Sequence, residues 1–185
     1  VIRKAMRLLD KTKNSNLVKV VVLENRWLDH FPSDYRDRVS IIHNAPRPLF
    51  TSNSVSNENL TFGVFCRPVK HKRHDIALKA LKALREKDIQ VKMIVTGNPF
   101  DDPPSWVEQH GWVSTDELRT IMEKCRFLLQ TSQSEGSSMS VIEAMSMGLL
   151  PIVSEASSET VGDHGVVVKG EDPLEWASVI ESEII

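Results

Sequence analysis

The residues best placed to do chemistry lie in one run, Gln130 to Glu155, which reads QTSQSEGSSMSVIEAMSMGLLPIVSE. Glu135 stands at the edge of a turn of small residues, Gly136 to Ser138. Glu143 follows eight positions after Glu135, inside the helix that this turn is expected to open. The first backbone N–H groups of a helix have no carbonyl partner within the helix, and small residues leave these groups exposed. Exposed N–H groups at a helix start bind phosphate oxygens well. The pattern therefore predicts an anion site.

The second glutamate narrows the ligand to a nucleoside diphosphate. If the helix begins near Ser138, Glu143 lies about five residues in, or roughly 7 Å along the axis. A carboxylate accepts two O–H bonds and repels phosphate, so we expect Glu143 to bind ribose hydroxyls while the pyrophosphate lies on the helix start. Glu135 is expected to bind a hydroxyl of the donor sugar, because a phosphate at that point would be repelled.

This run resembles the signature of the retaining glycosyltransferases of the GT-B fold, which carry two glutamates at this spacing. The family pattern is close to S-x-x-E-G-[FY]-G-x-x-x-[LI]-E-A-[MA]-[AS]-x-G-x-P-V-[VI]. The aromatic residue and glycine that usually follow E-G are Ser137 and Ser138 here, which makes the sugar-facing loop smaller and more polar. The positions that fit are Ser132, Glu135, Gly136, Glu143, Ala144, Met145, Gly148, Pro151 and Val153.

Cations for the diphosphate are expected from the segment FCRPVKHKRHD, residues 65–75. A departing diphosphate gathers negative charge as its glycosidic bond breaks, so it needs positive groups nearby. The segment resembles G-R-L-x-x-x-K-G-x-D of the same family, which implies that Arg67 and Lys72 hold the phosphates. Without the downstream motif, an ordinary solvated helix start is the favoured interpretation of Lys70, Lys72 and Arg73. Together with that motif, the phosphate role is favoured for Arg67 and Lys72.

The same segment departs from the family at two glycines, which are Cys66 and Arg73 here. Arg73 is expected either to crowd the loop or to add a third cation. Asp75 matches the family as a residue at a helix start. His71 and His74 have H-x-x-H spacing, but no third ligand is evident, so we expect no zinc site. No metal is required where cationic side chains neutralise the diphosphate.

Three more positions are expected to lie near the nucleotide base. Gly97, in VTGNP, resembles the family's V-G-x-G-P loop, and a plain turn glycine is the equal alternative. His110, Gly111 and Trp112 align with the segment that flanks the base, which implies backbone contacts from Trp112 or Val113. Trp112 as a core residue is the other interpretation.

Composition excludes some classes of protein. A net charge of −2 gives no electrostatic case for nucleic acid. No stretch approaches the ~18 apolar residues of a membrane span, and the N-terminus lacks a hydrophobic signal region. We therefore expect a cytoplasmic protein, with peripheral contact of a longer parent at the inner membrane face left open. Cys66 and Cys125 are expected to be free, buried thiols.

Strands and helices are expected to alternate along the chain, which predicts an α/β, Rossmann-like doubly wound parallel sheet with ligands at the carboxyl ends of its strands. The expected strands are residues 17–24, 38–45, 60–66, 91–97, a short one near Trp112, 127–132, 150–154 and 165–170. The expected helices are residues 2–13, a short one through Trp27, 74–87, a short one around Trp106, 115–125, one opening near Ser138, and 172–184.

The resemblance also implies a domain organisation. Residues 1–45 correspond to the end of the N-terminal GT-B domain and the crossover, where His43, Asn44 and Ala45 replace the usual P-N-G. Residues 46–59 are the expected linker, and residues 60–185 the C-terminal half of the GT-B fold, which binds the nucleotide sugar. Because the chain starts at Val1 without a methionine, we expect a fragment of a longer enzyme.

The implied activity is transfer of a hexosyl group, with retention, from a UDP-, GDP- or ADP-sugar to an acceptor hydroxyl, as in polysaccharide or glycoconjugate biosynthesis. The acceptor, a glycan, lipid or small molecule, would be held by the N-terminal domain, so we expect little turnover by this chain alone. Two alternatives stay open: a non-catalytic nucleotide-binding or interaction domain on the same scaffold, and another GT-B enzyme such as a nucleotide-sugar epimerase.

Overall fold

This computed structural model describes residues 2–12, 19–50 and 60–185. The chain divides into two units, Val1–Ala45 and Pro46–Ile185. Among the helices of the described ranges, none is long and apolar enough to cross a membrane. Most of the expected linker, residues 51–59, and the expected element ends at 13 and 17–18 lie outside the described residues.

The first unit is a small α/β arrangement in which β1 and β2 pair in parallel. Leu9 and Phe31 are buried in it, and the Arg38 guanidinium donates to the Leu9 carbonyl at 3.1 Å. Both expected strands are present but shorter, and the expected helix through Trp27 is a 3-10 helix. The elements are α1 (Ile2–Lys11), β1 (Val20–Val22), η1 (Asn25–His30), η2 (Ser33–Arg38) and β2 (Val39–Ile41).

The second unit is built on six parallel strands in the order β5-β4-β3-β6-β7-β8. The chain runs outward from β3 to β5, returns to the middle at β6, and then runs outward again to β8, which makes the sheet doubly wound as predicted. The central strands β3 and β6 pair with Phe62 opposite Phe127. The strands are β3 (Thr61–Val64), β4 (Lys92–Thr96), β5 (Val107–His110), β6 (Phe127–Gln130), β7 (Leu150–Ser154) and β8 (Val166–Val168).

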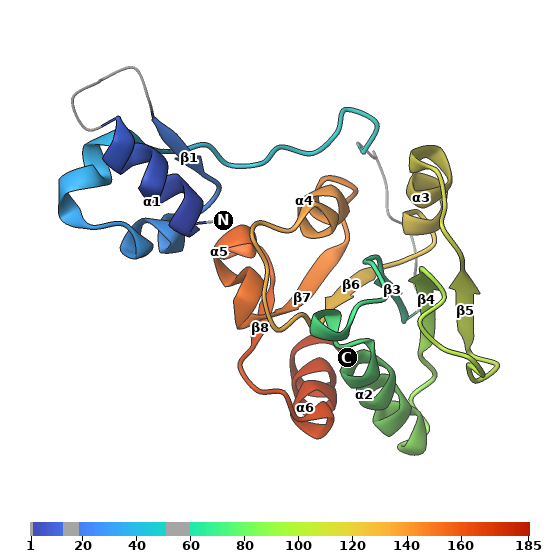
Figure 1. Cartoon of the computed structure of the whole chain (residues 1–185). Helices are drawn as coiled ribbons and strands as arrows, with labels where there is room; N and C mark the ends of the chain where they lie inside the picture. Colours follow the sequence, from blue (N-terminus) through green and yellow to red (C-terminus); the bar gives the residue numbers. More distant parts are fainter. Residues whose placement is uncertain (1, 13–18, 51–59) are drawn as a thin grey trace. The chain divides into compact units, whose positions relative to one another are not determined.

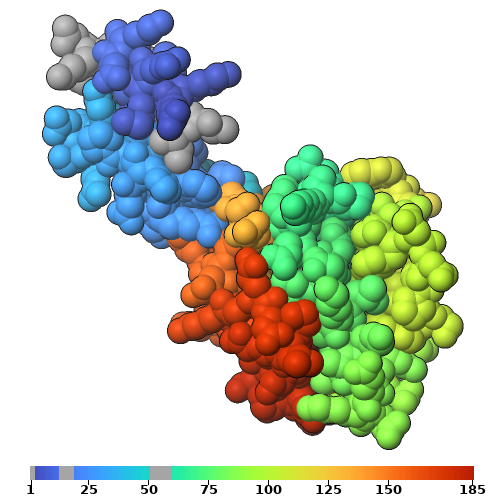
Figure 2. Space-filling model, turned by 60° about the horizontal axis from the view of Figure 1, so that its bottom comes forward, coloured from blue at the N-terminus to red at the C-terminus, as the bar shows by residue number. Residues whose placement is uncertain are grey.

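Helices cover both faces of this sheet. The helices α2 and α6 pack on one face, where they lie side by side in Figure 1, and Figure 2 shows the red surface of α6 bordering the green surface of α2. The opposite face is covered by α3, α4 and α5. The bounds are η3 (Lys70–Lys72), α2 (His74–Glu86), α3 (Thr115–Met122), α4 (Met139–Ser146), η4 (Glu155–Ser157), α5 (Ser158–Val161) and α6 (Pro173–Ile184).

The strands contribute to both hydrophobic cores because their side chains alternate between the two faces. In β6, Phe127 and Leu129 belong to the core under α2 and α6, whereas Leu128 belongs to the core under α3 and α4. The rings of Phe62 and Phe127 stack with centroids 4.8 Å apart. This double burial explains why the strands are almost continuous apolar runs in the sequence.

The structure differs from the sequence prediction between residues 101 and 114. The predicted helix around Trp106 is wrong, because that tryptophan lies in a turn that leads into β5. The predicted strand near Trp112 begins earlier, since Val107 to His110 pair in register with β4. Trp112 lies beyond the strand with 78% of its surface exposed, so it is not a core residue.

Candidate functional site

The site lies where the strand order reverses, between β3 and β6. The segments that follow these two strands leave the sheet in opposite directions, which opens a crevice at their carboxyl ends. Residues 65–73 follow β3 and include η3, while residues 131–138 follow β6 and lead into α4. Both motifs found in the sequence therefore reach the same edge of the sheet.

Hydrogen bonds join these two segments directly. The Gln133 N–H donates to the carbonyl of His71 at 2.7 Å. The Thr131 hydroxyl lies 2.7 Å from the carbonyl of Arg73 and 3.2 Å from that of Lys72. The loop after β6 therefore fixes the position of η3 and of the lysine at its end.

Lys72 and Glu135 form an ion pair across this junction. The Lys72 ammonium lies 2.6 Å from Oε1 of Glu135, and both side chains are largely buried. The sequence predicted a phosphate ligand and a sugar ligand at these positions, and the structure brings the two side chains together. The carboxylate and the ammonium therefore neutralise each other.

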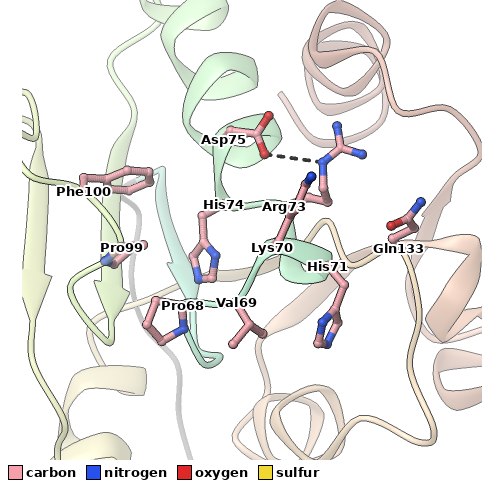
Figure 3. A pocket seen from close by; sticks show the side chains of 10 residues that line it. All are labelled: Pro68, Val69, Lys70, His71, Arg73, His74, Asp75, Pro99, Phe100 and Gln133. Carbon is pink, nitrogen blue, oxygen red and sulfur yellow. Dashed lines mark hydrogen bonds and ion pairs between the residues drawn. The ribbon is translucent and has the colours of Figure 1, made fainter.

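Arg73 adopts a backbone conformation that glycine adopts readily, with φ 51° and ψ 47°. Its guanidinium lies 2.6 Å from Glu171 and 3.4 Å from Asp75, and the contact with Asp75 is drawn in Figure 3. Its positive charge is thus shared with carboxylates, which differs from the free third cation that the sequence suggested. Asp75 lies in the first turn of α2, as expected.

The start of α4 lacks a side-chain cap. Ser138 is the N-cap residue, but its hydroxyl accepts a hydrogen bond from the buried Gln130 amide at 2.5 Å instead of capping the helix. By contrast, Ser114 forms a capping box at α3, and Asp172 caps α6. The first N–H groups of α4 are therefore left without the side-chain partner that the other two helices have.

The turn before α4 leaves room beside these N–H groups. Apart from Gly136 itself and its two chain neighbours, no heavy atom lies within 4 Å of the point where a Cβ on Gly136 would stand. Ser132 is buried, and among the described residues its hydroxyl has no hydrogen-bond partner. Open space and an unpaired hydroxyl in one short segment are typical of a site that a polar ligand completes.

Glu143 is the fifth residue of α4, as expected, and only 2% of its surface is exposed. Its Oε1 lies 2.5 Å from Nε of Arg47. A second nitrogen of the same guanidinium, Nη1, donates to the Thr115 hydroxyl at 2.7 Å. The sequence analysis missed Arg47, because it precedes Glu143 by 96 positions and belongs to no recognised motif.

A cavity of about 190 Å³ brings four of the predicted site residues together. Arg67, Gly97, Trp112 and Val113 all line it. Gly97 has φ 89°, and a Cβ there would stand 2.8 Å from Cδ of Pro68, so this turn accepts only glycine without rearrangement. The rest of the lining is Phe65, Cys66, Thr96, Gly111 and Leu118.

A larger cavity, of about 910 Å³, flanks η3. Figure 3 shows Lys70, His71 and Gln133 at one side of it and Phe100 at the other. Its walls come from the segments after β3, β4 and β6, so it also lies at the carboxyl edge of the sheet. This cavity therefore adds basic side chains, such as Lys70, to the edge of the sheet where the two motifs lie.

Cys66 and His74 form a neutral pair beside the site. The thiol lies 3.3 Å from Nε2 of the imidazole. Burial raises the pKa of Cys66 to about 12 and lowers the pKa of His74 below its usual 6.5. In the part of the chain that the structure describes, no three metal-binding side chains cluster, so the pair has no third ligand for a zinc ion.

Comparison with known proteins matches most of the second unit to one family. Residues 58–183 fit the sequence profile of the family described as Glycosyl transferases group 1. The GDP-mannose:cellobiosyl-diphosphopolyprenol alpha-mannosyltransferase of Xanthomonas oryzae is 30% identical over 91 residues, or 42% of this chain and 24% of that protein. A glycogen synthase of Streptococcus pneumoniae is 28% identical over 125 residues, or 61% of this chain and 24% of that enzyme. The chain thus spans about a quarter of the length of these relatives.

Solved structures resemble the fold at low sequence identity. The crystal structure of TarM superposes with a TM-score of 0.72 at 18% identity, over 88% of this chain and 36% of that one. Anabaena HepE, solved with UDP and glucose, gives a TM-score of 0.73 at 16% identity, over 99% of this chain and 56% of that one. These likenesses confirm the predicted Rossmann-like sheet of the GT-B type.

Proposed function

This chain belongs to the glycosyl transferases group 1 family, and we propose that it is the nucleotide-sugar-binding part of a retaining hexosyltransferase. In this proposal residues 60–185 form the C-terminal donor-binding domain of a GT-B enzyme. Residues 1–45 belong to the end of the N-terminal domain and the crossover, and residues 46–59 to the linker. The reaction moves a hexosyl group from a nucleoside diphosphate to an acceptor hydroxyl.

The observation that carries this proposal is the uncapped start of α4, with open space at Gly136 in the turn that precedes it. The N–H groups and the partial positive charge of a helix start bind phosphate oxygens well. The N–H groups of Gly136, Ser137 and Ser138 and of the first turn of α4 would hold the diphosphate there. Helices α3 and α6, which have side-chain caps, offer no such place.

Lys72 and Glu135 supply the charges that the leaving group and the sugar need. A bound diphosphate attracts Lys72 away from Glu135, because two phosphates carry more negative charge than one carboxylate. The freed carboxylate then accepts a hydroxyl of the donor sugar. Arg67 adds a second positive charge from the adjoining cavity, and both cations stabilise the charge that develops on the departing diphosphate.

The nucleoside is assigned to the side of the site formed by α4 and the small cavity. Glu143 would bind the ribose, while Gly97, Trp112 and Val113 would surround the base. The donor is a UDP-, GDP- or ADP-sugar, and no cofactor or metal is needed beyond it. Two solved neighbours hold UDP, namely Anabaena HepE and the pneumococcal O-GlcNAc transferase GtfA, so UDP is the first nucleotide to test.

Calorimetric titration of the chain with UDP, GDP and ADP tests the binding site. We expect at least one of them to bind, and Lys72→Ala to weaken it about tenfold or more, because a charge-assisted contact to phosphate is lost. Lys82→Ala is the matched control, since that lysine lies on the exposed face of α2 and pairs with Glu86 at 3.8 Å. Absence of binding by all three nucleotides would contradict the proposal.

Transfer itself is tested in the complete enzyme, because the acceptor is expected on the preceding domain. We expect hexosyl transfer that is lost on Arg67→Ala or Lys72→Ala, and a product with the anomeric configuration of the donor. Nucleotide binding without transfer would favour the non-catalytic interaction domain, and release of an altered nucleotide sugar would favour an epimerase. A product with inverted anomeric configuration would overturn the assignment of retention but not the assignment of hexosyl transfer.

A further inference from the structure

Arg47 is held in a fixed position by a tight turn. The Phe50 N–H donates to the Arg47 carbonyl at 2.9 Å, and Pro48 occupies the second position, where proline favours such a turn. Phe50 is fully buried in the core under α3 and α4. The Arg47 guanidinium carbon lies 4.7 Å from the centre of the Phe50 ring. The arginine therefore rests on an anchored ring.

From this position the guanidinium joins two helices of the site. Its Nε donates to Oε1 of Glu143, in the middle of α4, and its Nη1 donates to the hydroxyl of Thr115, the first residue of α3. Thr115 comes directly after Val113 and Ser114, and Val113 lines the cavity assigned to the base. Arg47 thus lies between the residue assigned to the ribose and the segment assigned to the base.

Burying a carboxylate such as Glu143 costs free energy unless a positive charge or several donors compensate for its lost hydration. Arg47 supplies that positive charge by its contact with Oε1 of Glu143. Among the side-chain hydrogen bonds of the described residues, the one that reaches this carboxylate ends on Oε1 and not on Oε2. An ionised carboxylate accepts bonds at both oxygens, so Oε2 remains able to accept a hydroxyl.

We propose that Arg47 is a positioning residue of the nucleotide site, which holds the Glu143 carboxylate turned so that its second oxygen accepts a ribose hydroxyl. This inference rests on the proposed function, and it adds a residue outside both motifs. The competing interpretation is that Arg47 occupies the place of the ribose and must leave when a nucleotide binds. The buried Phe50 and the second contact to Thr115 favour a guanidinium that stays.

The test compares each nucleotide that binds with its dideoxyribose analogue, which lacks both ribose hydroxyls. The ratio of the two affinities reports the ribose contact, because the base and phosphates are the same in both ligands. We expect the wild-type chain to prefer the ribonucleotide about tenfold or more, as for hydrogen bonds to an ionised group. Arg47→Ala should bring the ratio close to one, whereas Arg47→Lys should keep part of the preference for the ribonucleotide.

Matched variants separate this role from a loss of folding. Arg119→Ala removes another arginine–glutamate pair, on α3 with Glu123 at 2.7 Å, and should leave the ratio unchanged. Thermal unfolding of each variant shows whether it folds, and Arg47→Lys provides a second variant that keeps the charge. A purely structural role of Arg47 would weaken both ligands equally and leave the ratio as in the wild type.

Each other outcome overturns the inference in a recognisable way. Tighter binding of the ribonucleotide by Arg47→Ala would show that the arginine blocks the site. A wild-type ratio in Arg47→Ala, together with a lost ratio in Glu143→Ala, would reject Arg47 while the proposed function stands. If the wild-type chain binds neither ligand of any pair, the proposed function fails and this inference fails with it.

Discussion

Arg73 shows how one side chain is kept in an unfavourable backbone conformation. A left-handed residue other than glycine costs about 1–2 kcal/mol. We therefore expect Arg73→Gly to be more stable than Arg73→Ala by about 1 kcal/mol, because both lose the same ion pairs and only the glycine relieves the strain. Urea denaturation measures this difference. Lys79, inside α2, is the control position, where we expect the alanine variant to be more stable than the glycine variant. If glycine were the more stable replacement at both positions, or alanine at both, the explanation would be contradicted.

The two thiols should react slowly in the folded chain. Burial raises the pKa of both Cys66 and Cys125 from 9.0 to about 12, and the thiolate is the reactive form. At pH 8 we expect alkylation by iodoacetamide to be at least about tenfold slower than in the chain unfolded by urea. Because the folded pKa values are the higher ones, these groups also cost stability as the pH rises from 9 toward 12. Cys125 is buried as expected, whereas Cys66 is only partly buried, and equal labelling rates in both states would count against the raised pKa values of the thiols.

The residues of both motifs could be predicted from the sequence, but their partners could not. The motif spacing and the family resemblance predict that Glu135, Lys72 and Glu143 belong to one ligand site, and the structure places the segments that carry them at the same edge of the sheet. The Lys72–Glu135 pair joins residues 63 positions apart, and the Arg47–Glu143 pair joins residues 96 apart. Such contacts depend on how separate turns pack, which the spacing of residues along the chain does not encode.

At the scale of the element, the capping box of α3 is a feature that stabilises the helix start itself. Ser114 and Glu117 satisfy the start of α3 reciprocally, at 3.3 and 2.7 Å. We expect Ser114→Ala to lower the free energy of unfolding by about 1 kcal/mol and to leave nucleotide affinity unchanged. Chemical denaturation and calorimetry of the same variant measure the two quantities. A loss of affinity without a loss of stability would contradict a structural cap.

Most elements of the second unit follow from the sequence because they are buried apolar runs or amphipathic helices with clear end signals. The strand β5 does not, because it lies at the edge of the sheet and reads VEQH, with one buried residue. Its conformation is imposed by pairing with β4, for example Met93 opposite Val107. Hydrophobic periodicity cannot reveal a strand whose partner supplies most of the stabilisation.

For the whole molecule, the junction of β3 and β6 carries both the site and the centre of the fold. Phe62 and Phe127 stack across this junction in the core under α2 and α6. We expect Phe127→Ala to destabilise the chain by about 3–5 kcal/mol, as large-to-small changes in a packed core do. Urea denaturation measures the change, with Leu174→Ala, a largely exposed position, as the control. A loss below about 1 kcal/mol would show that this centre is loosely packed.

The strand order has a further consequence for solutions of this protein at high concentration. In the described part of the sheet, the outermost strands are β5 and β8, with four and three residues. Edge strands this short expose few unpaired backbone N–H and C=O groups. Another polypeptide that added a strand there would therefore form few hydrogen bonds. Edge-to-edge aggregation of this sheet is therefore disfavoured by its short outer strands, while the candidate site lies at the middle of the sheet.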